Sequence, residues 1–434
     1  MRKAAVLVAL AVTAAAPASA ATAVDAPTFH RDVLPILQSH CQECHRTGGP
    51  EISGMKAPMS LTEYGEVRPW ARSIRRVVEA REMPPWGATH ETSAQLANDR
   101  SLAPEQIDTI VRWVDQGAKA GDPADAPPPR TFQDTGWLIG EPDLVITMPE
   151  PVLVGDDVAD WQPYVSFTLT PEQLPEPRWI KVAEYKPNCD IIHHLTATIV
   201  PPPDEHGNER EPFFLGGIAT GSEPREYPPG FGRLLHPGST IVLSLHYNKE
   251  PGPGTGISNQ VTIGLKFYEP GEEVRYDLKQ TRIGRFFDFE IPPGHPDWKI
   301  GASMEIPQWA LLTSFSPHMH YRGKDMKYTA HYPDGTSELL IDVARYSFEW
   351  QIAYILEEPK LLPPGTRIEV EAHMDNSEER GRKFPEIDTT RPVRWGLLST
   401  DEMMHGFVTW SPIDEDEAKR WGGTEPSEAS GGSD

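Results

Sequence analysis

The chain has 434 residues, of which 38% are hydrophobic and 24% charged, so it carries enough apolar material for a packed core and is not disordered throughout. Its 64 acidic and 40 basic residues leave a formal net charge of −24, which excludes nucleic acid as an expected partner because a phosphate backbone binds basic surfaces. The 45 prolines and 35 glycines favour short strands and turns over long helices, so we expect a multidomain, mostly β protein.

An export signal is predicted over residues 1–20. Two basic residues precede an apolar run over 4–16, and Ala18-Ser19-Ala20 fits the small-residue pattern that signal peptidase cleaves. A single-pass membrane anchor is the alternative, but the run is short for a bilayer core. No later stretch of the sequence is long and apolar enough to span a membrane, so we expect a soluble protein without a membrane span, periplasmic or secreted.

The motif Cys41-Gln42-Glu43-Cys44-His45 predicts covalent attachment of one haem c. Two cysteines three residues apart let one helical turn present both thiols to the haem vinyl groups, while the imidazole of His45 reaches the iron from the same side. A redox dithiol or half of a zinc site is the alternative. Each would need a thioredoxin-like context or a second Cys/His pair at zinc spacing, and the sequence has neither.

Amphipathic helices are predicted on both sides of this motif, over 29–39 and 102–118, because apolar residues recur there at helical spacing. The stretch 27–122 resembles a class I cytochrome c domain. This resemblance implies a small all-α domain whose two helices enclose the haem. The proline-rich residues 123–136 predict an extended linker after it.

Met83 is the candidate sixth ligand of this haem. It lies in a loop, residues 81–86, where two prolines stiffen the backbone and suit a thioether ligand held for electron transfer. Met55 and Met59, in an earlier loop, are competing candidates. A methionine that merely fills the core is the remaining alternative.

From residue 137 onward the pattern predicts antiparallel β-sheets. Short runs rich in Val, Ile, Leu and aromatic residues, such as 144–147, 240–246 and 367–373, alternate with Pro, Gly and Asn/Asp turns. This spacing is typical of all-β sandwiches or jelly rolls. We therefore expect two all-β domains and an acidic, disordered tail, with the boundaries 137–275, 276–412 and 413–434.

Three groups of histidines lie on these predicted strands. His193 and His194 are adjacent, and neighbours on a regular strand point to opposite faces, so the strand must bulge there if both bind one metal. His246 ends an alternating strand. His318 and His320 are spaced by two, which puts both imidazoles on one face. Each histidine alone is more often an ordinary surface or core residue, and the grouping is what indicates a metal site.

Two methionines, Met403 and Met404, follow Asp401-Glu402 beyond these histidines. Imidazoles combined with a thioether favour a redox-active metal, and copper fits such ligands better than zinc. The order of His-His, His-Tyr, His-x-His and Asp-Glu-Met resembles the copper type II, ascorbate-dependent monooxygenases, the family of peptidylglycine α-hydroxylating monooxygenase and dopamine β-monooxygenase. The resemblance spans about 140–412.

This resemblance implies two jelly-roll domains, each holding one copper ion, that face each other across a solvent-filled cleft. One copper would transfer electrons, and the other would bind oxygen at the catalytic centre. The implied ligands are His193, His194 and His246 for the electron-transfer copper, and His318, His320 and Met403 for the oxygen-binding copper. Met404, and after it Met374, are the alternatives for the sulfur ligand.

Several positions depart from that family. Its animal members carry several disulfides, whereas Cys189 is here a single cysteine outside the haem motif and is expected to be a free, buried thiol. The peptide-amidating members hold the substrate carboxylate with an arginine and a tyrosine where this chain has Ser316 and Phe407, so a glycine-extended peptide is not the expected substrate. His405, two residues after Met403, is expected to support a metal ligand or to contact substrate.

These features together predict an exported copper-dependent monooxygenase that hydroxylates a C–H bond of an unknown small molecule with O₂. An external electron donor, with an electron-donor protein as a candidate partner, would supply electrons through the fused haem c, which would replace or supplement ascorbate as the reductant. Two alternatives stay open. One is a non-catalytic exported electron carrier or copper-binding protein, and the other is an oxidoreductase whose sandwiches dock a partner enzyme and whose histidines are structural.

Overall fold

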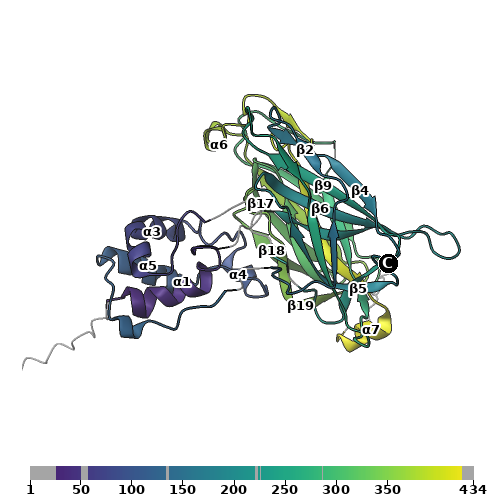
Figure 1. Ribbon diagram of the computed structural model, residues 1–434, viewed down its shortest axis with the longest axis horizontal. Helices are drawn as coiled ribbons and strands as arrows, with labels where there is room; N and C mark the ends of the chain where they lie inside the picture. Colours follow the sequence, from purple (N-terminus) through teal and green to yellow (C-terminus); the bar gives the residue numbers. More distant parts are fainter. Residues whose placement is uncertain are drawn as a thin grey trace, which may run out of the picture.

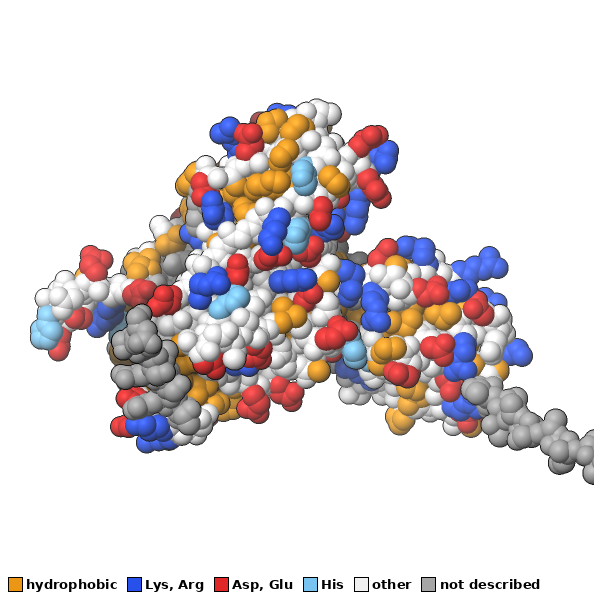
Figure 2. Space-filling model, turned by 180° about the vertical axis from the view of Figure 1, so that it is seen from behind, with side chains coloured by type: hydrophobic (Ala, Val, Ile, Leu, Met, Phe, Trp, Pro, Cys, Tyr) orange, Lys and Arg blue, Asp and Glu red, His pale blue; other side chains and the backbone are white. Residues whose placement is uncertain are grey.

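The computed structural model describes residues 26–49, 57–132, 136–219, 223–224, 226–285 and 287–422. The chain is mostly β-sheet with few helices, as the composition predicts, and consists of a helical unit followed by two β units (Figure 1). The predicted export signal and Met55 lie outside the described residues. Within the described ranges, no helix is long and apolar enough to cross a membrane. Acidic and basic side chains are interspersed over the face seen in Figure 2.

The helical unit is built around the two predicted helices. Proline at the first position of α5 costs no hydrogen bond, because that amide has no partner within a helix. The fully buried Phe29, Leu37, Ile110 and Trp113 lie in its core, and helices occupy both predicted stretches. The elements of this unit are η1 (Phe29–Val33), α1 (Leu34–His40), α2 (Tyr64–Val67), η2 (Arg68–Trp70), α3 (Ala71–Glu79), α5 (Pro104–Asp115) and η3 (Pro123–Asp125).

Residues 86–98, here called the docking segment, leave the helical unit and pack against the second β unit. The segment contains the short helix α4 (His90–Ser93), and its Trp86 and Leu96 belong to the same buried apolar cluster as that β unit. The Ala97 amide donates to a backbone carbonyl of the β unit, that of Ile355, at 2.8 Å. The expected helical domain over 27–122 therefore does not include this segment, because its apolar side chains are buried elsewhere.

The proline-rich linker lies along the helical unit and is not a free spacer. Arg130 pairs with Glu43 at 3.2 Å, and the guanidinium of Arg46 lies 4.1 Å from the centre of the Phe132 ring. Such ion pairs and cation–π contacts are individually weak. Together they hold the described part of the linker, residues 123–132, against the turn that follows α1.

The first β unit is a sandwich of two main sheets. One sheet has the order β1-β11-β5-β8-β12 and the other β3-β9-β6-β7, with β4 also paired to β9. Leu195 and Leu243 of the second sheet pack with Leu265 of the first in a fully buried core. The strands are β1 (Leu144–Thr147), β2 (Val152–Val154), β3 (Asp160–Trp161), β4 (Tyr164–Thr168), β5 (Arg178–Lys186), β6 (Ile192–Val200), β7 (Phe213–Ala219), β8 (Phe231–Leu235), β9 (Thr240–Asn248), β10 (Ile257–Asn259), β11 (Thr262–Phe267) and β12 (Tyr276–Asp277).

The second β unit is also a sandwich, with the sheets β13-β22-β16-β19 and β15-β20-β17-β18. Phe315 of the first sheet packs with Tyr328 and Val370 of the second in its core. The elements are β13 (Lys279–Arg285), β14 (Glu290–Ile291), β15 (Trp298–Glu305), β16 (Ala310–His318), β17 (Gly323–His331), β18 (Ser337–Val343), β19 (Tyr354–Leu362), β20 (Arg367–Met374), α6 (Glu378–Lys383), β21 (Val393–Arg394) and β22 (Met404–Pro412). The strands predicted over 144–147, 240–246 and 367–373 are confirmed as β1, β9 and β20.

The two β units meet the C-terminal segment in a further apolar cluster. Phe231 and Tyr276 of the first unit pack there with Leu311 of the second unit and with Ala418 of helix α7 (Glu415–Arg420). The expectation of a disordered tail is therefore wrong up to residue 422, because this stretch has an apolar surface to bury. Residues 423–434 lie outside the described part of the chain.

Candidate metal centres

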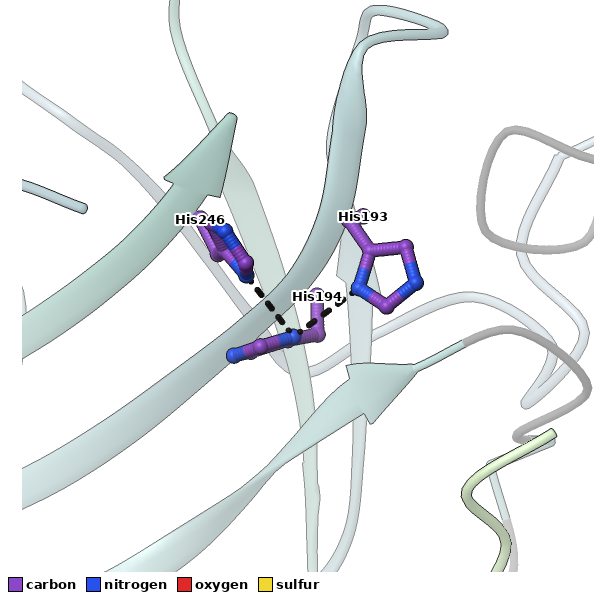
Figure 3. A group of neighbouring side chains, drawn as sticks. All are labelled: His193, His194 and His246. Atoms are coloured by element: carbon purple, nitrogen blue, oxygen red, sulfur yellow. Dashed lines mark hydrogen bonds between the residues drawn. The ribbon is translucent and has the colours of Figure 1, made fainter. Parts of the chain in front are cut away.

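Strands β6 and β9 bring the first three histidines together (Figure 3). In the antiparallel register His194 pairs directly with His246, and the register shifts between Ile192 and His194. This irregularity confirms the predicted bulge, which lets His193 reach the same side of the sheet as the other two rings. The three side chains, here called the first group, therefore converge from two neighbouring strands.

The ring nitrogens of the first group are spaced for one metal ion. Nδ1 of His194 lies 3.2 Å from Nδ1 of His193 and 3.3 Å from Nδ1 of His246. One nitrogen from each ring falls within 4.8 Å of the others. Two nitrogens this far apart, each bound at about 2.0–2.1 Å, subtend roughly 105° at a metal, close to a tetrahedral angle. Asp160 Oδ1 lies 2.7 Å from Nε2 of His246, on the opposite side of that ring.

A second group comes from the end of β16 and the turn after it. The rings of His318 and His320 lie 5.3 Å apart and nearly perpendicular. Gln351 Oε1 lies 2.6 Å from Nδ1 of His318, and the Asp401 carbonyl oxygen lies 3.3 Å from Nδ1 of His320. Both oxygens can only accept, so each ring carries its proton on Nδ1 and leaves Nε2 as the metal-binding atom.

Two of the three methionine candidates, Met404 and Met374, lie in the apolar core of the second β unit. Met404, on β22, belongs to the buried core, so the next residue, His405, points to the opposite face. His405 pairs with His318 in the register, and their rings stack 5.8 Å apart. Met403 comes just before β22, is 8% exposed, and stays the candidate sulfur ligand for the second group. Met374, the third candidate, fills the same apolar core as Met404.

The two groups lie against each other. The rings of His194 and His318 are 6.3 Å apart. Phe348, which is 2% exposed, stacks on His193 at 4.6 Å and meets His320 edge-on at 5.7 Å. The expected solvent-filled cleft between the groups is therefore wrong for this structure, because a buried aromatic side chain and direct ring contact take its place.

Burial keeps His193, His194, His318 and His320 neutral. It lowers the pKa of His193 to about 4, an effect to which nearby His246 adds, and it also lowers the pKa values of His194, His318 and His320. The neutral imidazole is the form that binds a metal. Protons therefore do not compete with a cation for these rings at neutral pH.

A buried ionic network fixes the turn of the second group. The two carboxylate oxygens of Glu402 accept backbone amides, from His320 at 2.9 Å and from Arg322 at 2.7 Å. The Arg322 guanidinium, 1% exposed as a residue, donates to the Asn376 side chain and to the Thr400 carbonyl, both at 2.8 Å. Burial raises the pKa of Glu402 to about 7. These contacts tie the His-x-His turn to the loop before β22.

Several supporting residues escaped the sequence analysis, namely Asp160, Arg322, Phe348 and Gln351. The sequence could have indicated Arg322, because it lies two residues after the candidate ligand His320. The other three become neighbours of the histidines only through the fold. Asp160, for example, is 86 positions from His246 in the chain.

The positions where the chain departs from the peptide-amidating enzymes lie beside the second group. Ser316 and Phe407 pair across β16 and β22, two residues from the His318 and His405 pair. On the other side of β22, Phe407 pairs with Arg282 of β13. A basic residue therefore lies next to the position where the peptide-amidating enzymes have a tyrosine. Cys189 is half-buried and forms no disulfide.

The predicted haem-attachment motif forms one helical turn after α1. The Cys41 carbonyl accepts the amides of Cys44 at 3.2 Å and of His45 at 2.9 Å. The Met59 carbonyl lies 3.3 Å from Nδ1 of His45, which leaves Nε2 for an iron. Both cysteines are unbridged, and burial raises the pKa of Cys41 to about 12, so it is present as the thiol that adds to a vinyl group. The residues fit covalent haem attachment.

The candidate sixth ligands lie in two loops of the helical unit. Met83 is half-buried after α3, with its amide 3.2 Å from the Val77 carbonyl, and it leads through two prolines into the docking segment. Met59 is partly buried against the helical core. Both stay candidates for a sulfur ligand of the iron.

Comparison with known proteins gives one distant relative by sequence. No family model matches the chain. DBH-like monooxygenase protein 1 of Gallus gallus is 24% identical over 234 residues, which cover 48% of this chain and 35% of that protein, so the chain spans about a third of its length.

Solved structures give only weak likenesses. The major capsid protein P2 from bacteriophage PM2 has a TM-score of 0.28 at 7% identity, covering 63% of this chain and 98% of that one. The VP2 subviral particle of infectious bursal disease virus has a TM-score of 0.16 at 10% identity, covering 64% and 83%. Neither likeness carries an argument. The sequence relative, however, supports the resemblance of this chain to the copper type II monooxygenases.

Proposed function

We propose that this protein is a copper-dependent monooxygenase that hydroxylates a C–H bond of a small molecule with O₂. The observation that carries the proposal is the convergence of three Nδ1 atoms directly beside a second histidine pair. The similarity to a DBH-like monooxygenase supports it. In the proposal, one copper is held by His193, His194 and His246, and the other by His318, His320 and Met403.

Bound copper would supply the redox chemistry of the balanced reaction R–H + O₂ + 2e⁻ + 2H⁺ → R–OH + H₂O, with one electron stored at each group. The residues around the groups orient the ligands and exclude water. Gln351 and the Asp401 carbonyl fix the ring orientation of the second group. Phe348 keeps water out of the space between the groups, and their direct contact shortens the path for an electron between them.

The helical unit completes the proposal as a fused class I cytochrome c. Haem c bound to Cys41, Cys44 and His45 would pass electrons from an electron-donor protein toward the β units, whereas ascorbate would reduce the copper ions directly. The docking segment supports this role, because it begins three residues after Met83 and ends in the core of the second β unit. Export to the periplasm or out of the cell is part of the same proposal.

Protein matured with haem c is expected to contain one haem and two coppers per chain, measured by pyridine haemochrome spectra and elemental analysis. Replacing both Cys41 and Cys44 by Ser is expected to remove the covalent haem and leave both coppers, because the ligands lie in separate units. Cys189→Ser is the matched control and is expected to keep all three. One haem without copper after reconstitution would contradict the monooxygenase and favour an exported electron-transfer or docking module.

Met83→Ala is expected to lower turnover driven by an electron-donor protein while ascorbate-driven turnover stays largely intact, because only the first route needs the haem as a relay. Oxygen consumption with each donor measures the two rates. Met59→Ala is the control, and it is expected to change neither rate. An equal loss with both donors in Met83→Ala would argue against the relay, and a donor-specific loss in Met59→Ala would move the ligand assignment to Met59.

A further inference from the structure

Asp160 lies behind His246 of the first group. It lies on β3, which pairs with the end of β9, and its Oδ1 atom is 2.7 Å from Nε2 of His246. His246 is almost completely buried, whereas the side chain of Asp160 is 25% exposed. The carboxylate therefore touches the face of the first group that is turned away from the converging Nδ1 atoms.

The contact determines which nitrogen of His246 is free. A carboxylate accepts a hydrogen bond from a ring N–H, so Nε2 carries the proton and Nδ1 keeps its lone pair toward His194. A metal ligand that donates its other ring N–H to a carboxylate becomes a stronger donor.

We infer that Asp160 is a positioning residue that orients His246 for the metal of the first group. The inference rests on the proposed function, because it assigns Asp160 a role toward a copper ligand.

Copper affinity tests the orienting role directly. In the full-length holoprotein, Asp160→Ala is expected to weaken binding of one copper by about 10–100-fold, as removal of a residue supporting a metal ligand typically does, and to leave the other copper in place. Chelator competition followed by elemental analysis measures this. Asp157→Asn, an exposed carboxylate just before β3, is the matched control and is expected to leave both affinities unchanged.

A second variant separates orientation from charge. Asp160→Asn keeps an oxygen that accepts from His246 but loses the negative charge, so it is expected to retain both coppers and to change the Cu(II) electron paramagnetic resonance spectrum of one. This measurement also serves if the alanine variant does not fold. Wild-type copper affinity in Asp160→Ala, or an unchanged spectrum in Asp160→Asn, would overturn the inference and leave the proposed function in place. A wild-type protein that takes up no copper would overturn the proposed function and the inference with it.

Discussion

His246→Ala and His320→Ala are each expected to remove one copper ion per chain and to abolish O₂ consumption coupled to product. Each imidazole lies in a different group, so each variant leaves the other ligand set complete. The loss of activity should exceed the roughly 10–100-fold that removal of a supporting residue costs, because a ligand itself is removed. Elemental analysis and product assays on the same preparations measure both effects.

His331→Ala is the matched control for these variants. His331 lies on β17, where Nε2 is 2.7 Å from Glu369, away from both groups. It is expected to keep two coppers and full activity. Retention of both coppers in either His246→Ala or His320→Ala would contradict the ligand assignment, and loss of both coppers from His331→Ala would point to a general effect of histidine removal on folding.

Arg322→Ala is expected to lower the free energy of unfolding by about 1–3 kcal/mol for each buried acceptor left without a donor, because its guanidinium bonds to the Asn376 side chain and to the Thr400 and Asp388 carbonyls. The same change frees the turn that holds His320, so the copper of the second group should also be lost. Denaturant unfolding of the metal-free protein gives the stability, and metal content gives the second effect.

Two further variants identify the cause of this loss. Arg367→Ala removes an exposed arginine that pairs with Glu369 at 3.3 Å, and it is expected to change stability by no more than about 0.5 kcal/mol. Adding Glu402→Gln to Arg322→Ala should cost less than the sum of the single changes, because the charges of the two side chains attract each other and that attraction is lost only once. Additive costs would show that Arg322 stabilises the turn through its hydrogen bonds alone.

The sequence by itself determined those helices and strands whose apolar residues recur at the spacing of the element. Apolar spacing placed η1, α1 and α5 of the helical unit and the strands β1, β9 and β20, because a side chain's face follows directly from the helical or strand period, whereas it did not predict α2 or α3. The adjacency of His193 and His194 predicted a bulge, because two neighbours can share one side only where the strand is irregular. The prediction of a disordered tail was wrong for the complementary reason. The acidic composition predicted disorder, yet apolar residues of α7 pack in a buried cluster with both β units.

Tertiary structure alone decided how the parts of the candidate site meet. The packing of β22 placed Met404, which the sequence left open as a sulfur ligand, in the apolar core. The contact of the two histidine groups, and the place of Phe348 between them, depend on how two sandwiches pack. Periodicity in a sequence relates residues that are only a few positions apart. These contacts join residues that are distant in the chain, so only the packed fold determines them.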